Sequence, residues 1–237
     1  MSSANTSTRS AVERRIRWRP AWRLVPSRFP VVGPWDRIAD PADFDALANL
    51  EGLTNPRLRE QLGQLSITPR GRWLTGPGAT PVMAAFAHRN PEGSRFSDGS
   101  YGVFYASHAL QTAIRETVFH RERFLARTRE PAMQVQMRGY HCNISCALHD
   151  LRGGYPAAHD PVDYGPAQRL AARLRGAGSN GIVYDSVRDP GGQCAAVFWP
   201  DKVGPCRVAK HYAYVWDGTA IRDVLELTSL PLDEAHR

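Results

Sequence analysis

Hydrophobic and polar residues along this 237-residue chain alternate with two periods, one typical of helices and one typical of strands. In 108–125 the apolar residues recur at i, i+3, i+4 and i+7, which predicts an amphipathic helix with Ser107 as its N-cap. A second helix is predicted from Pro166, with its apolar residues on one face and Gly176 or Gly178 at its end. The pattern thus predicts two amphipathic helices in the second half of the chain.

Two further helices are predicted nearer the N-terminus. The stretch "ADPADFDALANLEG" (39–52) begins with an Asp–Pro pair suited to a helix start and ends in glycine. The stretch "TNPRLREQLG" (54–63) repeats that arrangement. The apolar segment 82–87 is expected to be buried, as a helix or as a strand.

Strand-like segments make up much of the remaining chain. They are 101–107, 133–140, 142–151, 180–187, 193–199 and 210–216. The turn "RDPGG" joins the fourth and fifth of them into a predicted hairpin. Strands with helices inserted between them, without regular alternation, predict an α+β fold with a mixed β-sheet core and flanking helices. We expect one domain over 20–237, preceded by a basic, flexible arm over 1–19.

The charge is unevenly distributed. The net charge is +7, and all but two of the 30 basic residues are arginine, whose planar fork suits phosphate and carboxylate groups. The segment "RRIRWRPAWR" (14–23) interleaves arginine with tryptophan, which keeps a nucleic-acid-binding module open as an alternative function. Nothing comparable follows, so direct DNA binding is not expected.

The sequence also bears on compartment and metal binding. No apolar run approaches the roughly 20 residues that span a bilayer, and the first 20 residues hold no apolar signal-peptide core. We expect a cytoplasmic protein with four free cysteines, although an organellar transit peptide is an alternative for the Ser- and Arg-rich start. A zinc site in "HCNISCALHD" is not expected, because a strand would hold Cys142 and Cys146 about 13 Å apart.

Three stretches stand out as motifs: "GSRFSDGSYGVFYAS" (93–107), "AIRETVFHRE" (113–122) and "GIVYDSVRDPGG" (181–192). Their order and spacing resemble the RES-domain family, the toxin half of bacterial toxin–antitoxin pairs, named for an arginine, a glutamate and a serine. The resemblance covers roughly residues 20 to 218. It places the family arginine on Arg95 and the glutamate on Glu116.

The same resemblance places the family tyrosine on Tyr105, the serine on Ser186 and an upstream arginine on Arg23. It implies a fold like that of mono-ADP-ribosyltransferases and attack on NAD+, with release of nicotinamide. The products would be ADP-ribose, a phosphorolysis product or an ADP-ribosylated protein acceptor. It also implies a small antitoxin partner, often with an Xre-like DNA-binding domain.

The residue types suit this chemistry. Loss of nicotinamide leaves an oxocarbenium-like ribose, which the Glu116 carboxylate could stabilise. The Arg95 fork could bind pyrophosphate, the Tyr105 ring could stack on nicotinamide, and the Ser186 hydroxyl could orient Glu116 or the ribose. Arg23 is a further candidate for NAD+ binding.

Each candidate also has a plainer interpretation. Glu116 could be a solvated residue paired with Arg115 or His120, and Arg95 a solvated loop residue. Tyr105 could serve packing alone, and Ser186 could serve only to begin a turn. A catalytically silent partner of a regulatory protein therefore stays open as a further alternative.

Overall fold

The computed structural model describes residues 11–28, 33–37, 67–88 and 90–230. In this part of the chain, one sheet has the strand order β1-β2-β5-β4-β3-β6-β7. The strands are β1 (Glu13–Pro26), β2 (Phe104–Ser107), β3 (Met133–Asp150), β4 (Gly181–Asp185), β5 (Gln193–Val197), β6 (Arg207–Trp216) and β7 (Ile221–Leu227). The helices are α1 (Pro34–Arg37), α4 (Thr80–Ala87), α5 (Leu110–Thr128) and α6 (Gly165–Gly176), with short 3-10 turns η2 (Arg70–Arg72), η3 (Pro156–Ala158) and η4 (Pro200–Lys202). The predicted α+β class is confirmed.

Five of the strands close on themselves. β1 pairs with β2 at one edge and also with β3 along most of its length, so β1, β2, β5, β4 and β3 form a closed ring. β3 and β4 are parallel, and the other pairs are antiparallel. β6 and β7 extend the sheet beyond β3. The hairpin predicted around "RDPGG" is confirmed as β4–β5.

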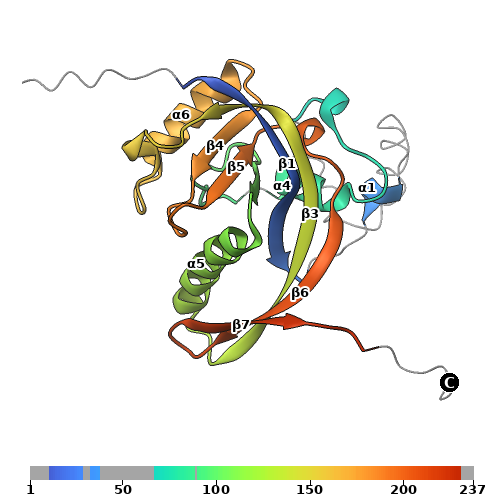
Figure 1. The fold of residues 1–237 in the computed structure, drawn as a ribbon, viewed down its shortest axis with the longest axis vertical. Coiled ribbons are helices and arrows are strands. Elements are labelled where there is room, and N and C mark those ends of the chain that lie inside the picture. Colours follow the sequence, from blue (N-terminus) through green and yellow to red (C-terminus); the bar gives the residue numbers. More distant parts are fainter. Residues whose placement is uncertain (1–10, 29–32, 38–66, 89, 231–237) are drawn as a thin grey trace, which may run out of the picture.

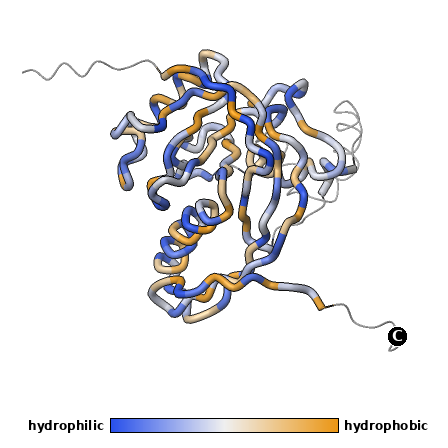
Figure 2. The backbone as a smooth tube through the Cα atoms, in the orientation of Figure 1, coloured by the Kyte–Doolittle hydropathy of each residue, from blue (hydrophilic) through white to orange (hydrophobic). Residues whose placement is uncertain are grey.

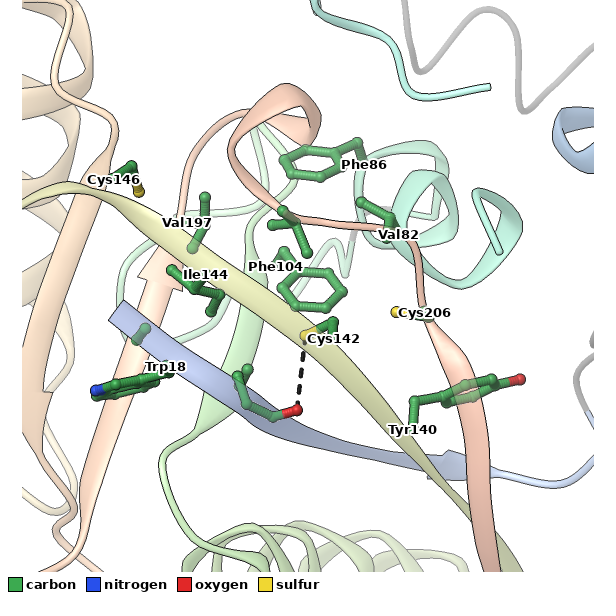
Figure 3. Packing of buried hydrophobic residues seen from close by; sticks show 14 of the residues in the cluster. Trp18, Val82, Phe86, Phe104, Tyr140, Cys142, Ile144, Cys146, Val197 and Cys206 are labelled. Atoms are coloured by element: carbon green, nitrogen blue, oxygen red, sulfur yellow. Dashed lines mark hydrogen bonds between the residues drawn. The ribbon is translucent and has the colours of Figure 1, made fainter. Parts of the chain in front are cut away.

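The core is divided by this ring of strands. On one side, α4 supplies Val82 and Phe86 to a cluster that surrounds Phe104 of β2 and includes Ile144 of β3 (Figure 3). On the other side, α6 packs over β4 and β5 in a second cluster that includes Tyr184. Neighbouring residues on β2, β4 and β5 face these two clusters alternately, as the period of a strand requires. Figure 1 shows α4 and α6 on opposite sides of these strands.

Helix α5 packs on a third cluster. Ala113 lies there with Leu24 of β1, Met137 of β3 and Tyr214 of β6, all buried. Figure 2 shows hydrophobic and hydrophilic residues alternating along α5, as expected for a helix with one buried face. Because this face of α5 is buried against the sheet, the rotation of the helix about its axis is fixed, and with it the side chains that face the β4–β5 turn.

Some boundaries differ from the prediction. α5 begins at Leu110 with Ala109 as N-cap, and Ser107 is not its cap: the Ser107 hydroxyl contacts the Cys194 thiol at 3.4 Å. The segments 133–140 and 142–151 form one continuous strand, β3. The apolar segment 82–87 is helical, within α4. The helices predicted over 39–52 and 54–63 lie outside the described residues.

The predicted flexible arm is wrong over residues 13–19, which form the first half of β1. Ile16 and Trp18 are each 5% exposed, while the arginines between and beside them face solvent. Trp18 stacks on His108 with ring centroids 5.1 Å apart. Because this tryptophan is in the core, it is not available to stack on nucleic-acid bases, and the nucleic-acid alternative loses its main support.

The strand assignment predicts that substitutions at neighbouring positions of β1 change the free energy of unfolding by very different amounts. Trp18→Ala should lower the free energy of unfolding by about 3–5 kcal/mol, because it empties a buried aromatic site. Arg17→Ala, at an exposed position of the same strand, should change it by no more than about 0.5 kcal/mol. Urea unfolding of both variants measures the difference. Equal, small effects would show that 13–19 do not belong to the folded domain.

Candidate active site

A serine and a glutamate from distant parts of the chain meet beside the β4–β5 turn. Ser186, directly after β4, donates its hydroxyl to Oε1 of Glu116 on α5 at 2.6 Å. The Cys194 thiol of β5 lies 4.0 Å from the same oxygen. Arg115 instead pairs with Asp189 at 3.2 Å. Glu116 is therefore anchored to Ser186, and the predicted alternative of a glutamate bonded to Arg115 or His120 is not what the structure shows.

Cys194 stays a neutral thiol. Burial raises its pKa to about 12, and the neighbouring Glu116 carboxylate acts in the same direction. A thiol with so high a pKa holds almost no thiolate at neutral pH. Cys194 thus packs against Glu116 without being a nucleophile.

Tyr105 holds the segment that carries Arg95. Its hydroxyl accepts the Phe96 N–H at 2.9 Å and lies 2.8 Å from the Ser94 hydroxyl, so it is bonded on both sides of Arg95. Burial raises the Tyr105 pKa to about 12, which keeps the phenol protonated at neutral pH. Its ring packs against the α6-side cluster. Tyr105 thus serves packing and also positions the loop before β2.

Arg95 is buried rather than solvated, at 9% exposure. Its Nη1 donates to the carbonyl oxygens of Ala158 at 3.0 Å and Asp160 at 2.8 Å. Its guanidinium lies 4.5 Å from the centroid of the Tyr164 ring. Arg95 therefore ties the loop before α6 to the segment before β2.

Tyr184 on β4 lies among the candidate residues, although the sequence analysis did not single it out. Burial raises its pKa well above the usual value, Glu116 and Tyr105 raise it further, and Arg95 opposes them. All three side chains therefore lie near enough to the Tyr184 hydroxyl to act on it electrostatically. Glu116, Tyr105, Arg95 and the adjoining Ser186 are thus brought together on the α6 side of the sheet.

Several guanidinium groups act on the part of α5 that follows Glu116. His120 lies one helical turn after Glu116, and although it is exposed, partial removal of its ring from water lowers its pKa to about 4. The guanidinium groups of Arg188, Arg121, Arg123 and Arg95 act in the same direction. Such a concentration of guanidinium groups favours an anionic ligand.

Arg188 links three parts of this region. Its guanidinium carbon lies 3.5 Å from the centroid of the Phe119 ring on α5, and its Nη2 donates to the Pro161 carbonyl at 2.6 Å. The residue before it, Val187, lines a shallow, open depression together with residues that include Ser186 and His159.

The structure does not place Arg23 with this group. Its side chain lies on the α4 side, over the Phe104 ring at 4.6 Å, and its Nη1 donates to the Tyr105 carbonyl at 2.9 Å. Burial lowers its pKa, while the nearby Cys206 and Cys142 act in the opposite direction. Its contact with β2 is to the main chain, so Arg23 supports the strand that carries Tyr105 instead of facing Glu116.

Within the described ranges, no group of three or more His, Cys, Asp and Glu side chains is arranged to hold a metal ion. Cys142 and Cys146 both lie on β3, as the sequence analysis expected. Over the same ranges, no helix combines the length and the apolar character needed to span a membrane.

Comparison with known proteins identifies the class. Residues 69–217 match the RES domain family, and the chain belongs to this family. It is 34% identical over 205 residues to the uncharacterized protein y4oC of Sinorhizobium fredii, covering 84% of each chain. A structure of the M. tuberculosis MbcT–MbcA toxin–antitoxin complex aligns with a TM-score of 0.43 and 10% identity, over 85% of this chain and 87% of that one.

Proposed function

We propose that this protein is the toxin of a toxin–antitoxin pair and that it cleaves the nicotinamide–ribose bond of NAD+. The observation that carries the proposal is the hydrogen bond between Ser186 and Glu116, 70 residues apart, with Arg95 and Tyr105 close by. These are the residues that the resemblance to the RES family marks as functional. Their convergence on one side of the sheet supports a common role.

The chemistry assigns a role to each. When the bond from C1′ of the ribose to the nicotinamide nitrogen breaks, the electron pair leaves with nicotinamide and an oxocarbenium cation remains. The Glu116 carboxylate stabilises that cation electrostatically, and Ser186 holds the carboxylate in place. Arg95 and Arg188, which bond to the carbonyls of the consecutive residues Asp160 and Pro161, suit the pyrophosphate. A nucleophile then bonds to C1′ and loses its proton.

The nucleophile decides the product. Water gives ADP-ribose, phosphate gives a phosphorolysis product, and a protein side chain gives mono-ADP-ribosylation. Unrestrained loss of NAD+ would arrest growth, so we expect a cognate antitoxin, with an Xre-like DNA-binding domain, to keep the protein silent in the cytoplasm.

The direct test is to incubate the purified protein with NAD+ and to measure free nicotinamide, separating the other product by chromatography. We expect steady release of nicotinamide. Reactions run with and without phosphate or protein acceptors identify the second product. EDTA should not change the rate, because guanidinium groups supply the positive charge facing the pyrophosphate. Activity that disappears with EDTA and returns with zinc would contradict this. No nicotinamide under any condition would favour a catalytically silent regulatory protein.

A further inference from the structure

The turn that follows Ser186 determines which hydrogen bonds the Ser186 hydroxyl accepts and donates. A serine hydroxyl has one proton to donate and two lone pairs that accept. The main-chain N–H groups of Arg188, at 3.2 Å, and Asp189, at 2.9 Å, both donate to Ser186 Oγ. The remaining proton is directed to Glu116. The conformation of this turn therefore decides whether Ser186 donates to Glu116.

The turn is attached to α5 by the side chain of Asp189. Its Oδ2 accepts the Thr112 hydroxyl at 2.7 Å, and its Oδ1 lies 3.2 Å from Nε of Arg115. Thr112 is 1% exposed and lies one helical turn before Glu116. The contacts thus form a closed ring from α5 through Asp189 and Ser186 back to Glu116 on α5.

Gly192 allows the turn to approach the helix this closely. Its N–H donates to the Asp189 carbonyl, and its own carbonyl accepts the Ser186 N–H, each at 2.8 Å. A Cβ at position 192 would lie 2.6 Å from Thr112 Oγ1 and 2.7 Å from Asp189 Oδ2. Any side chain would therefore separate Asp189 from Thr112, so the sequence "RDPGG" is suited to this contact.

We infer that Thr112 and Asp189 are positioning residues, which hold Ser186 in hydrogen-bonding contact with Glu116 and so fix the carboxylate for catalysis. Neither needs to touch the substrate. The inference rests on the proposed function to the extent that the Glu116 carboxylate acts on the ribose. It goes beyond that function by assigning a task to the N-terminal turn of α5 and to the acidic residue of the β4–β5 turn.

The test removes one hydroxyl. Thr112→Val keeps the shape of the side chain and loses the bond to Asp189, whereas Thr112→Ser keeps the hydroxyl. We expect Thr112→Val to lower kcat for nicotinamide release by about ten- to a hundredfold, since small displacements of catalytic groups have effects of this size. KM should stay within about threefold because the guanidinium groups are untouched. Thr112→Ser should restore kcat to within about threefold of wild type, and an unchanged kcat in Thr112→Val would overturn the inference.

A double-mutant cycle separates positioning from general stability. If Thr112 acts through Ser186, adding Thr112→Val to Ser186→Ala should cause little further loss of kcat. Independent, multiplying losses would overturn the inference. Should Thr112→Val fail to fold, Asp189→Ala replaces it in the cycle, because it removes the carboxylate that accepts the Thr112 hydroxyl.

A crystal structure of the Thr112→Val variant tests the positioning role without relying on any substrate or reaction. Wild-type protein that releases no nicotinamide would disprove the proposed function but not the geometry. We expect the Ser186 Oγ to Glu116 Oε1 contact to lengthen beyond hydrogen-bonding distance in the variant. A contact unchanged from the 2.6 Å of the wild type would overturn the positioning role, whatever reaction the protein catalyses.

Discussion

Glu116→Gln should lower the turnover of NAD+ by about a hundred- to a thousandfold while leaving the fold intact. The amide keeps the size of the side chain, and its oxygen can still accept the Ser186 hydroxyl that now reaches Oε1. Only the negative charge is lost. Removing a preorganised charge from an oxocarbenium-like transition state should raise the barrier by about 3–4 kcal/mol. Nicotinamide release measures the rate, and calorimetry measures NAD+ binding, which should survive.

Glu122→Gln is the matched control. Glu122 is on the same helix and accepts the N–H of Ile221, at the start of β7, at 2.8 Å, an interaction that an amide oxygen can also make. Its turnover should equal that of the wild type. Expressed without an antitoxin, the wild type and Glu122→Gln should arrest bacterial growth, and Glu116→Gln should not. Turnover by Glu116→Gln within about threefold of wild type would remove the carboxylate from the mechanism.

The fold class could be predicted from the sequence, while several boundaries could not. The prediction divided β3 at His141, two residues after Gly139, although β3 runs on without interruption. In the structure, the register with β6 shifts between Arg138 and Tyr140, and the Tyr212 ring lies 3.1 Å from where a Cβ of Gly139 would be. A glycine in a strand can mark such a bulge or close approach instead of an end.

The error over residues 13–19 has a different cause. The serine- and arginine-rich composition suggested a flexible arm, yet Ile16 and Trp18 alternate with arginine at the period of a strand. Pro20 lies where the β1–β3 register shifts, the kind of position at which a strand tolerates proline. The alternation was visible in the sequence, but the partner strand that buries it, over 120 residues away, was not.

The candidate site could likewise be predicted from the sequence only in part. Arg95, Tyr105, Glu116 and Ser186 could be named from motif resemblance, because those motifs keep their order and spacing. The contact of Thr112 with Asp189 joins residues 77 positions apart and follows no local period, so no pattern within one helix or one turn indicates it. Arg23 was also named from the resemblance, but β1 directs its side chain to the α4 side of the sheet, away from Glu116.

Arg95→Lys should weaken the use of NAD+ although the charge is kept. Both loop contacts use Nη1 alone, and among the described residues Nε and Nη2 have no protein partner, so they can bind a pyrophosphate. A lysine has one nitrogen for both tasks and no planar group to lie against Tyr164. Losing a hydrogen bond to a charged group costs about 1.5–3 kcal/mol, so KM should rise by roughly ten- to a hundredfold, with a smaller change in kcat.

The matched control is Arg173→Lys, which changes an exposed arginine on α6 and should leave both constants unchanged. Steady-state kinetics on the three proteins measure the effect, and values for Arg95→Lys within twofold of wild type would exclude Arg95 from substrate binding and leave it the task of holding the loop before α6.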